Sequence, residues 1–163
     1  MTIAPIIRTV EVKAGPSRAF ELFTARMGDW WPRGRTIGKN PHALIVIEPQ
    51  AGGDWFERDG AGVETRWGKV AIWEPPFRLV LVWQIDCQWS YNPLVQTEIE
   101  LAFAPIEGGG TRVTLEHRRF ESLGGEAARQ REILDGGWPG MLSGFAALAA
   151  EAEAPTGDPG GPA

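Results

Sequence analysis

Cysteine is almost absent from this chain of 163 residues, in which Cys87 is the only one. No disulfide can form within the chain, so stability must come from a packed core, and a domain of this length can bury one without cross-links. The scarcity of cysteine also fits a reducing compartment. Because the sequence contains no apolar run long enough to cross a bilayer, we expect a cytoplasmic protein.

Clustered positive charge is also lacking. Lys and Arg total 16 against 21 Asp and Glu, which gives a net charge of -5, and the longest basic run is the pair Arg118 and Arg119. Nucleic acids and anionic membrane surfaces both require a concentrated cationic patch. The composition therefore predicts no nucleic-acid partner and no membrane partner, and it leaves small apolar molecules as the expected ligands.

Residues that bind transition metals are few and far apart. His42, Cys87 and His117 show none of the paired spacings that zinc sites use. Residues 34–40 resemble a phosphate-binding loop, but the segment is one residue short and has Asn40 where that motif places a magnesium-binding hydroxyl. The sequence therefore predicts no metal site and no cofactor.

Alternation of apolar and polar residues predicts seven β-strands. The first covers residues 6–13, where Val10 and Val12 alternate with polar neighbours. Short turn-compatible segments, such as the glycines at 52 and 53, separate six further runs, and connections this short indicate antiparallel neighbours. The six runs are residues 43–48, 54–58, 65–73, 78–88, 95–104 and 111–118.

Helical spacing occurs near both ends of the chain. Pro16 opens a helix with Phe20 and Phe23 on one face, and a second short helical turn follows it. Near the C-terminus, residues 126–135 predict a short helix that a glycine pair ends, after which a longer helix carries one apolar stripe to about residue 152. We expect a single domain over residues 1–153 and a disordered tail over residues 154–163.

This order of elements predicts an α+β helix-grip fold, in which a seven-stranded antiparallel sheet, with two short helices after its first strand, curves around a C-terminal helix. Such a sheet often leaves a void beside the helix, and bulky inward side chains would line it. Eight tryptophans are many for this length, so we expect rings on a pocket wall as well as in the core. The predicted pocket residues are Trp31, Trp55, Trp83, Ile85, Trp89, Thr97, Ile99, His117, Trp138, Met141, Leu142 and Phe145.

Two polar side chains are candidates for chemistry in such a pocket. His117 lies on the face of the last strand that is predicted to point inward. An imidazole there could orient a ligand or act as an acid or base, although buried histidines more often only form hydrogen bonds within a core. Glu57 shares parity with Trp55, so its carboxylate would also point inward and would need a partner. No convergent catalytic set follows, and the sequence does not decide whether the protein is an enzyme.

Short motifs spread over nearly the whole domain carry a family resemblance. They are AF at 19–20, WWP at 30–32, EP at 48–49 with GG at 52–53, WGKV at 67–70, WEPP at 73–76, RL at 78–79 and GGWP at 136–139. Through them the chain resembles the SRPBCC, or START-like, superfamily, and within it bacterial proteins similar to the C-terminal domain of the activator of Hsp90 ATPase. The resemblance implies the helix-grip fold and a cavity for hydrophobic ligands. It implies no single activity, because such proteins include carriers, cyclases, receptors and co-chaperones.

Three functions follow as hypotheses. The first is binding of a small apolar or aromatic ligand in the cavity. The second is a cyclase- or hydrolase-like enzyme that uses His117, with Glu57 as a possible partner. The third is a protein-interaction or co-chaperone-like module, such as a homodimer, in which the rings of Trp30 and Trp31, if exposed, would meet a partner. Activation of Hsp90 itself is not expected, because the resemblance does not extend to the half of the eukaryotic activator that engages the chaperone.

Overall fold

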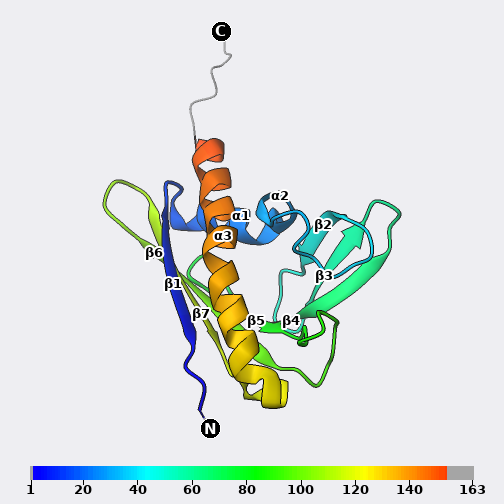
Figure 1. The fold of residues 1–163 in the computed structure, drawn as a ribbon. Helices are drawn as coiled ribbons and strands as arrows, with labels where there is room; N and C mark the ends of the chain where they lie inside the picture. Colours follow the sequence, from blue (N-terminus) through cyan, green and yellow to red (C-terminus); the bar gives the residue numbers. More distant parts are fainter. Residues whose placement is uncertain (1, 154–163) are drawn as a thin grey trace.

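The computed structural model describes residues 2–153, which form one curved antiparallel sheet wrapped around a long helix (Figure 1). The strands are β1 (Ile6–Val12), β2 (His42–Ile47), β3 (Asp54–Asp59), β4 (Glu64–Glu74), β5 (Arg78–Trp83), β6 (Thr97–Pro105) and β7 (Thr111–Arg118). Their order across the sheet is β1-β7-β6-β5-β4-β3-β2. The predicted α+β helix-grip fold is confirmed. The predicted tail, residues 154–163, lies outside the described residues.

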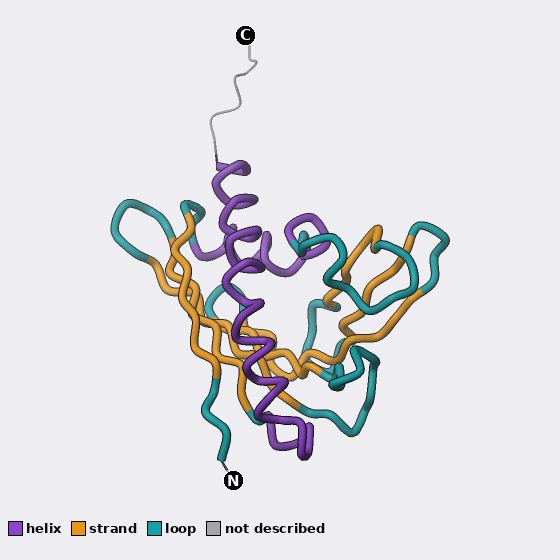
Figure 2. The backbone as a smooth tube through the Cα atoms, viewed as in Figure 1, coloured by secondary structure: helices purple, strands orange, loops and turns teal. Residues whose placement is uncertain are grey.

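The helices lie on the concave side of the sheet (Figure 2). α1 (Pro16–Ala25) and α2 (Met27–Trp30) follow β1, and the 3₁₀ helix η1 (Phe120–Glu126) leads from β7 into α3 (Ala127–Glu153). α3 runs across the sheet and contacts β1, α1 and α2. Between residues 2 and 153, none of the helices combines the length and the apolar character needed to span a membrane.

α3 is one continuous helix, so the prediction of two helices separated by a glycine pair is wrong. Pro139 lies inside this helix and has no N–H to offer the carbonyl of Asp135, four residues earlier. Arg8 on β1 takes that place, because its Nη2 donates to the carbonyl oxygen of Asp135 at 3.3 Å and to the carboxylate oxygen Oδ1 at 2.9 Å. A contact from a distant strand thus compensates for the proline.

β5 is shorter than the strand predicted over residues 78–88, because the chain turns away after Trp83. Asp86 organises the turn: its Oδ1 accepts hydrogen bonds from two backbone N–H groups within the next four residues, both at 3.0 Å. Ile85 is still buried, but Trp89 is 44% exposed. The predicted inward alternation therefore ends at Ile85.

β4 carries an additional residue opposite β3, and this bulge directs one more indole into the core. The register shifts after the pair Trp55 and Gly68, which makes Trp67 the additional residue. Only glycine fits at position 68, since a Cβ there would lie 1.8 Å from the carbonyl oxygen of Val82 on β5. As a result Trp67 is almost completely buried.

Five indole rings fill much of the space between the sheet, α2 and α3, and we call them the indole cluster: Trp31, Trp55, Trp67, Trp83 and Trp138. Trp83 contacts all four of the other rings, and the centroid of Trp67 lies 5.0 Å from that of Trp31 and 5.3 Å from that of Trp55. Trp83 contacts Trp138 at 6.3 Å. Tilted aromatic pairs of this kind contribute roughly 0.5–1.5 kcal/mol each beyond their buried area. The cluster therefore leaves little empty space between the sheet and the helices in this region.

Candidate ligand-binding cavity

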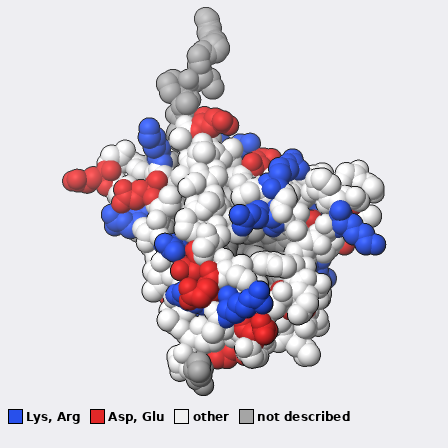
Figure 3. Space-filling model, in the orientation of Figure 1, with Lys and Arg blue, Asp and Glu red and all other residues white. Residues whose placement is uncertain are grey.

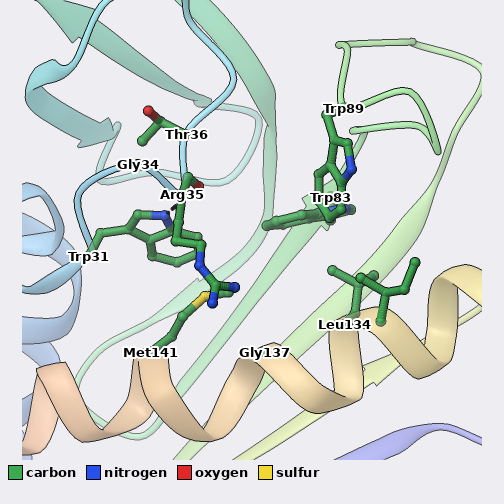
Figure 4. Close-up of a pocket in the computed structure, with 10 residues that line it drawn as sticks. Trp31, Gly34, Arg35, Thr36, Trp83, Trp89, Leu134, Gly137 and Met141 are labelled. Atoms are coloured by element: carbon green, nitrogen blue, oxygen red, sulfur yellow. Dashed lines mark hydrogen bonds between the residues drawn. The ribbon is translucent and has the colours of Figure 1, made fainter.

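A cavity of about 370 Å³ lies at one end of the indole cluster, between α3, the end of β5 and the loop that follows α2 (Figure 4). It is lined by Trp31, Gly34, Arg35, Thr36, Trp83, Trp89, Ile133, Leu134, Gly137 and Met141. Figure 3 shows a hollow beside α3 on the corresponding face of the molecule. The volume falls within the range of roughly 300–1,000 Å³ that is typical of small-molecule sites.

Four of the predicted pocket residues border this cavity, namely Trp31, Trp83, Trp89 and Met141. The other eight are buried in the packed core and do not line it: Trp55, Ile85, Thr97, Ile99, His117, Trp138, Leu142 and Phe145. Strand parity thus identified inward side chains, but it did not distinguish those that other rings cover from those that face the void.

The remaining lining residues were not among the predicted ones. Gly34, Arg35 and Thr36 lie in the loop after α2, where the sequence offered only an incomplete phosphate motif. Ile133, Leu134 and Gly137 lie on the first half of α3. A signal for these was present, because Leu134, Gly137 and Met141 are spaced three and four residues apart and share a helix face once the glycine pair is read as helical.

His117 is fully buried and belongs to a chain of hydrogen bonds within the core. Its Nδ1 accepts a bond from Trp138 Nε1 at 3.2 Å, which assigns the proton to Nε2, and Nε2 donates to Thr97 Oγ1 at 2.9 Å. Thr97 Oγ1 in turn donates to the carbonyl oxygen of Trp83 at 3.0 Å. Burial lowers the pKa of His117 to about 3, because the charged imidazolium would lose its hydration. These bonds suit a neutral imidazole that positions two residues of the indole cluster.

Glu57 is buried on β3 and fastens the loop that follows α2 to the sheet. Its Oε1 accepts hydrogen bonds from Trp67 Nε1 at 2.8 Å and from the backbone N–H groups of Ile37 and Gly38 at 2.9 and 3.0 Å. One carboxylate oxygen therefore joins the indole cluster to the loop. Because that loop forms one wall of the cavity, Glu57 positions the wall without bordering the cavity itself.

Two of three comparisons place the chain among known proteins. Residues 13–150 match the family model described as activator of Hsp90 ATPase homolog 1-like protein. Among solved structures, the anthrahydroquino-γ-pyrone synthase Txn09 is 38% identical with a TM-score of 0.64, and the match covers 90% of this chain and 97% of that one. No curated protein matches significantly.

Two further structures are similar in fold. The self-sacrificing resistance protein CalC from Micromonospora echinospora is 29% identical with a TM-score of 0.71, over 93% of this chain and 97% of that one. The Aha1 dimer from Colwellia psychrerythraea is 17% identical with a TM-score of 0.62, over 93% and 99% of the two chains. Together with the family model, which spans most of the residues, these matches show that the chain belongs to the activator of Hsp90 ATPase homolog 1-like family of SRPBCC proteins.

Proposed function

We propose that this protein binds a small apolar or aromatic molecule in the cavity beside α3. The observation that carries the proposal is the lining, in which three indole rings and Met141 border a void of about 370 Å³. Flat aromatic walls favour a flat apolar guest. Trp83 also offers a buried Nε1 that has no acceptor within residues 2–153, and a ligand oxygen that reached it would restore a hydrogen bond. Similarity to a synthase of an anthrahydroquino-γ-pyrone agrees with such a ligand.

An enzyme is the second candidate, because the relative that is 38% identical is a synthase. His117 is buried away from the lining and its pKa is lowered to about 3, which argues against this imidazole as the acid or base. Of the lining residues, only Arg35 is ionisable. Turnover would therefore depend on how the cavity folds its substrate and on Arg35, and a His117→Gln variant that remains folded would retain it.

The interaction-module hypothesis loses its original basis, because Trp30 and Trp31 are 4% and 3% exposed. A pair of buried rings offers no contact surface to a partner. A homodimer stays a prediction, motivated by a fold relative that forms a dimer. Light scattering of the purified protein measures the molecular mass in solution directly. A monomer at high protein concentration would contradict the homodimer.

Filling the cavity should abolish ligand binding while leaving the fold intact. Leucine in place of Gly137 would extend beside Met141 and Arg35, whose nearest atoms lie 3.4 and 3.5 Å from a Cβ at that position. Leucine also favours a helix over glycine by up to about 1 kcal/mol. We expect 2-naphthamide, a neutral two-ring probe, to bind the natural protein in calorimetry and to bind Gly137→Leu at least about tenfold more weakly.

Gly140→Leu is the matched control, because it makes the same change on the same helix where a Cβ meets no atom within 4 Å. This variant should bind the probe as the natural protein does. Failure of the natural protein to bind two- and three-ring aromatic probes, whether neutral or acidic, or equal binding by both leucine variants, would remove the proposal.

Trp89 lies at the mouth of the cavity in a left-handed conformation, with a φ of 59°. That conformation costs a side chain other than glycine roughly 1 kcal/mol, so Trp89→Gly should leave the free energy of unfolding unchanged or raise it. The same variant removes one aromatic wall, and we expect it to weaken 2-naphthamide binding about fivefold. Leu94→Ala, which shortens an exposed side chain of the same loop, is the control. Unchanged affinity in Trp89→Gly would exclude this ring from the site.

A further inference from the structure

Arg35 is the one charged side chain on the wall of an otherwise uncharged cavity. We propose that the ligand carries an acidic oxygen, a carboxylate, phenolate or enolate, on its aromatic framework, and that this oxygen pairs with the Arg35 guanidinium. The inference rests on the proposed ligand-binding function and specifies the chemical class of the ligand.

The loop segment that carries Arg35 is basic, although the whole protein is acidic. Residues 32–41 include Arg33, Arg35 and Lys39 and contain no carboxylate, although the net charge of the chain is -5. Within residues 2–153, none of these three cations forms an ion pair with a carboxylate. Figure 3 shows basic side chains above the hollow and side chains of both signs below it. Arg35 is thus the only charged lining residue that can attract an anion into the cavity.

Contacts from Trp31 and Glu57 fix the backbone of the loop at Arg35. Trp31 Nε1 donates to the carbonyl oxygen of Arg35 at 3.0 Å, and Glu57 holds the backbone two and three residues further on. The Arg35 side chain extends from the loop toward Met141 on α3 (Figure 4). The guanidinium lies beside Gly137, where a Cβ would be in van der Waals contact with Arg35 Nη1 at 3.5 Å. These bonds fix the backbone, so that the exposed Arg35 side chain is presented at the wall of the cavity.

The surrounding side chains make a cation necessary for an acidic ligand. Leu134, Gly137 and Met141 supply an uncharged helix face, and Trp31 and Trp83 supply apolar ring surfaces. An ionised oxygen that entered this lining without a partner would lose hydration and gain nothing. Guanidinium is suited to the task, because it remains charged at every physiological pH and can donate two parallel hydrogen bonds to one carboxylate.

The test compares two probes that share one ring system, 2-naphthoate and the neutral 2-naphthamide, by titration calorimetry at about pH 7.5, where the carboxylate is ionised. In Arg35→Met, the affinity for 2-naphthoate should fall about tenfold, whereas the affinity for 2-naphthamide should change less than about twofold. Arg35→Lys keeps the charge but not the planar fork, and it should recover part of the loss.

Lys39→Met is the matched control, because it removes the same charge from the same loop at a residue that does not line the cavity. It should change the affinity of either probe less than about twofold. Equal losses for both probes in Arg35→Met, or an equal loss of 2-naphthoate binding in Lys39→Met, would overturn the pairing while leaving the ligand-binding function intact. If the natural protein binds neither probe, both proposals fall.

Discussion

Replacing Glu57 with alanine should lower the free energy of unfolding by about 3 kcal/mol and release the loop that walls the cavity. The change leaves Trp67 Nε1 and the N–H groups of Ile37 and Gly38 without their acceptor. Each donor that loses a buried partner costs about 1 kcal/mol or more. Urea unfolding measures the change in the free energy of unfolding. The rate at which trypsin cleaves after the three basic side chains in the loop at 32–41 reports the release of that loop.

Glu57→Gln separates the hydrogen bonds from the charge, because the amide keeps an acceptor oxygen of the same reach. This variant should lose about 1 kcal/mol and should resist trypsin nearly as well as the natural protein. Glu64→Ala, on the neighbouring strand and paired at the surface with Arg58, controls for loss of a carboxylate and should stay within about 0.5 kcal/mol. If Glu57→Ala is as stable as Glu64→Ala, the carboxylate does not hold the loop.

The fold was largely predictable because five of the six strand pairings in its sheet join strands that follow one another in the chain. Antiparallel strands joined by short turns need only local alternation and turn residues, and the run predicted over residues 111–118 has the bounds of β7 (Thr111–Arg118). The errors arose where another signal decided the structure. Continuity of α3 depends on Arg8, more than a hundred residues away, whereas the early end of β5 depends on the Asp86 turn, a local signal that the apolar alternation outweighed.

The candidate site was less predictable, because a cavity is what packing leaves over. Parity placed Trp83 and His117 on the same side of the sheet, yet only Trp83 faces the void, since Trp138 covers the imidazole. Arg35 lies in a loop without periodicity, and its place on the wall follows from the bonds that Glu57 and Trp31 make with that loop. The bond from Ile37 to Glu57, which is 20 residues away, has no signature in a single sequence.

Acid should destabilise the protein through His117, by about 2 kcal/mol between pH 7.5 and pH 5. The folded state lowers the pKa of this imidazole from 6.5 to about 3, so below pH 6.5 the unfolded chain binds a proton that the folded chain excludes. The contribution of His117 to the free energy of unfolding is fully present above pH 6.5 and is lost as the pH falls toward 3. Each pH unit well inside that window costs about 1.4 kcal/mol.

The His117 contribution is obtained from the difference between two curves of unfolding free energy against pH, one for the natural protein and one for His117→Gln. The variant should be less stable at neutral pH, because Trp138 Nε1 loses its acceptor, but its stability should decline less steeply below pH 6.5. If the variant does not fold, the imidazole resonances of the natural protein decide, since they should show no titration between pH 7 and pH 5 in the folded state. Protonation near pH 6.5 would mean that the chain from Trp138 through His117 to Thr97 opens to water, and the indole cluster could not then be the rigid wall that both proposals require.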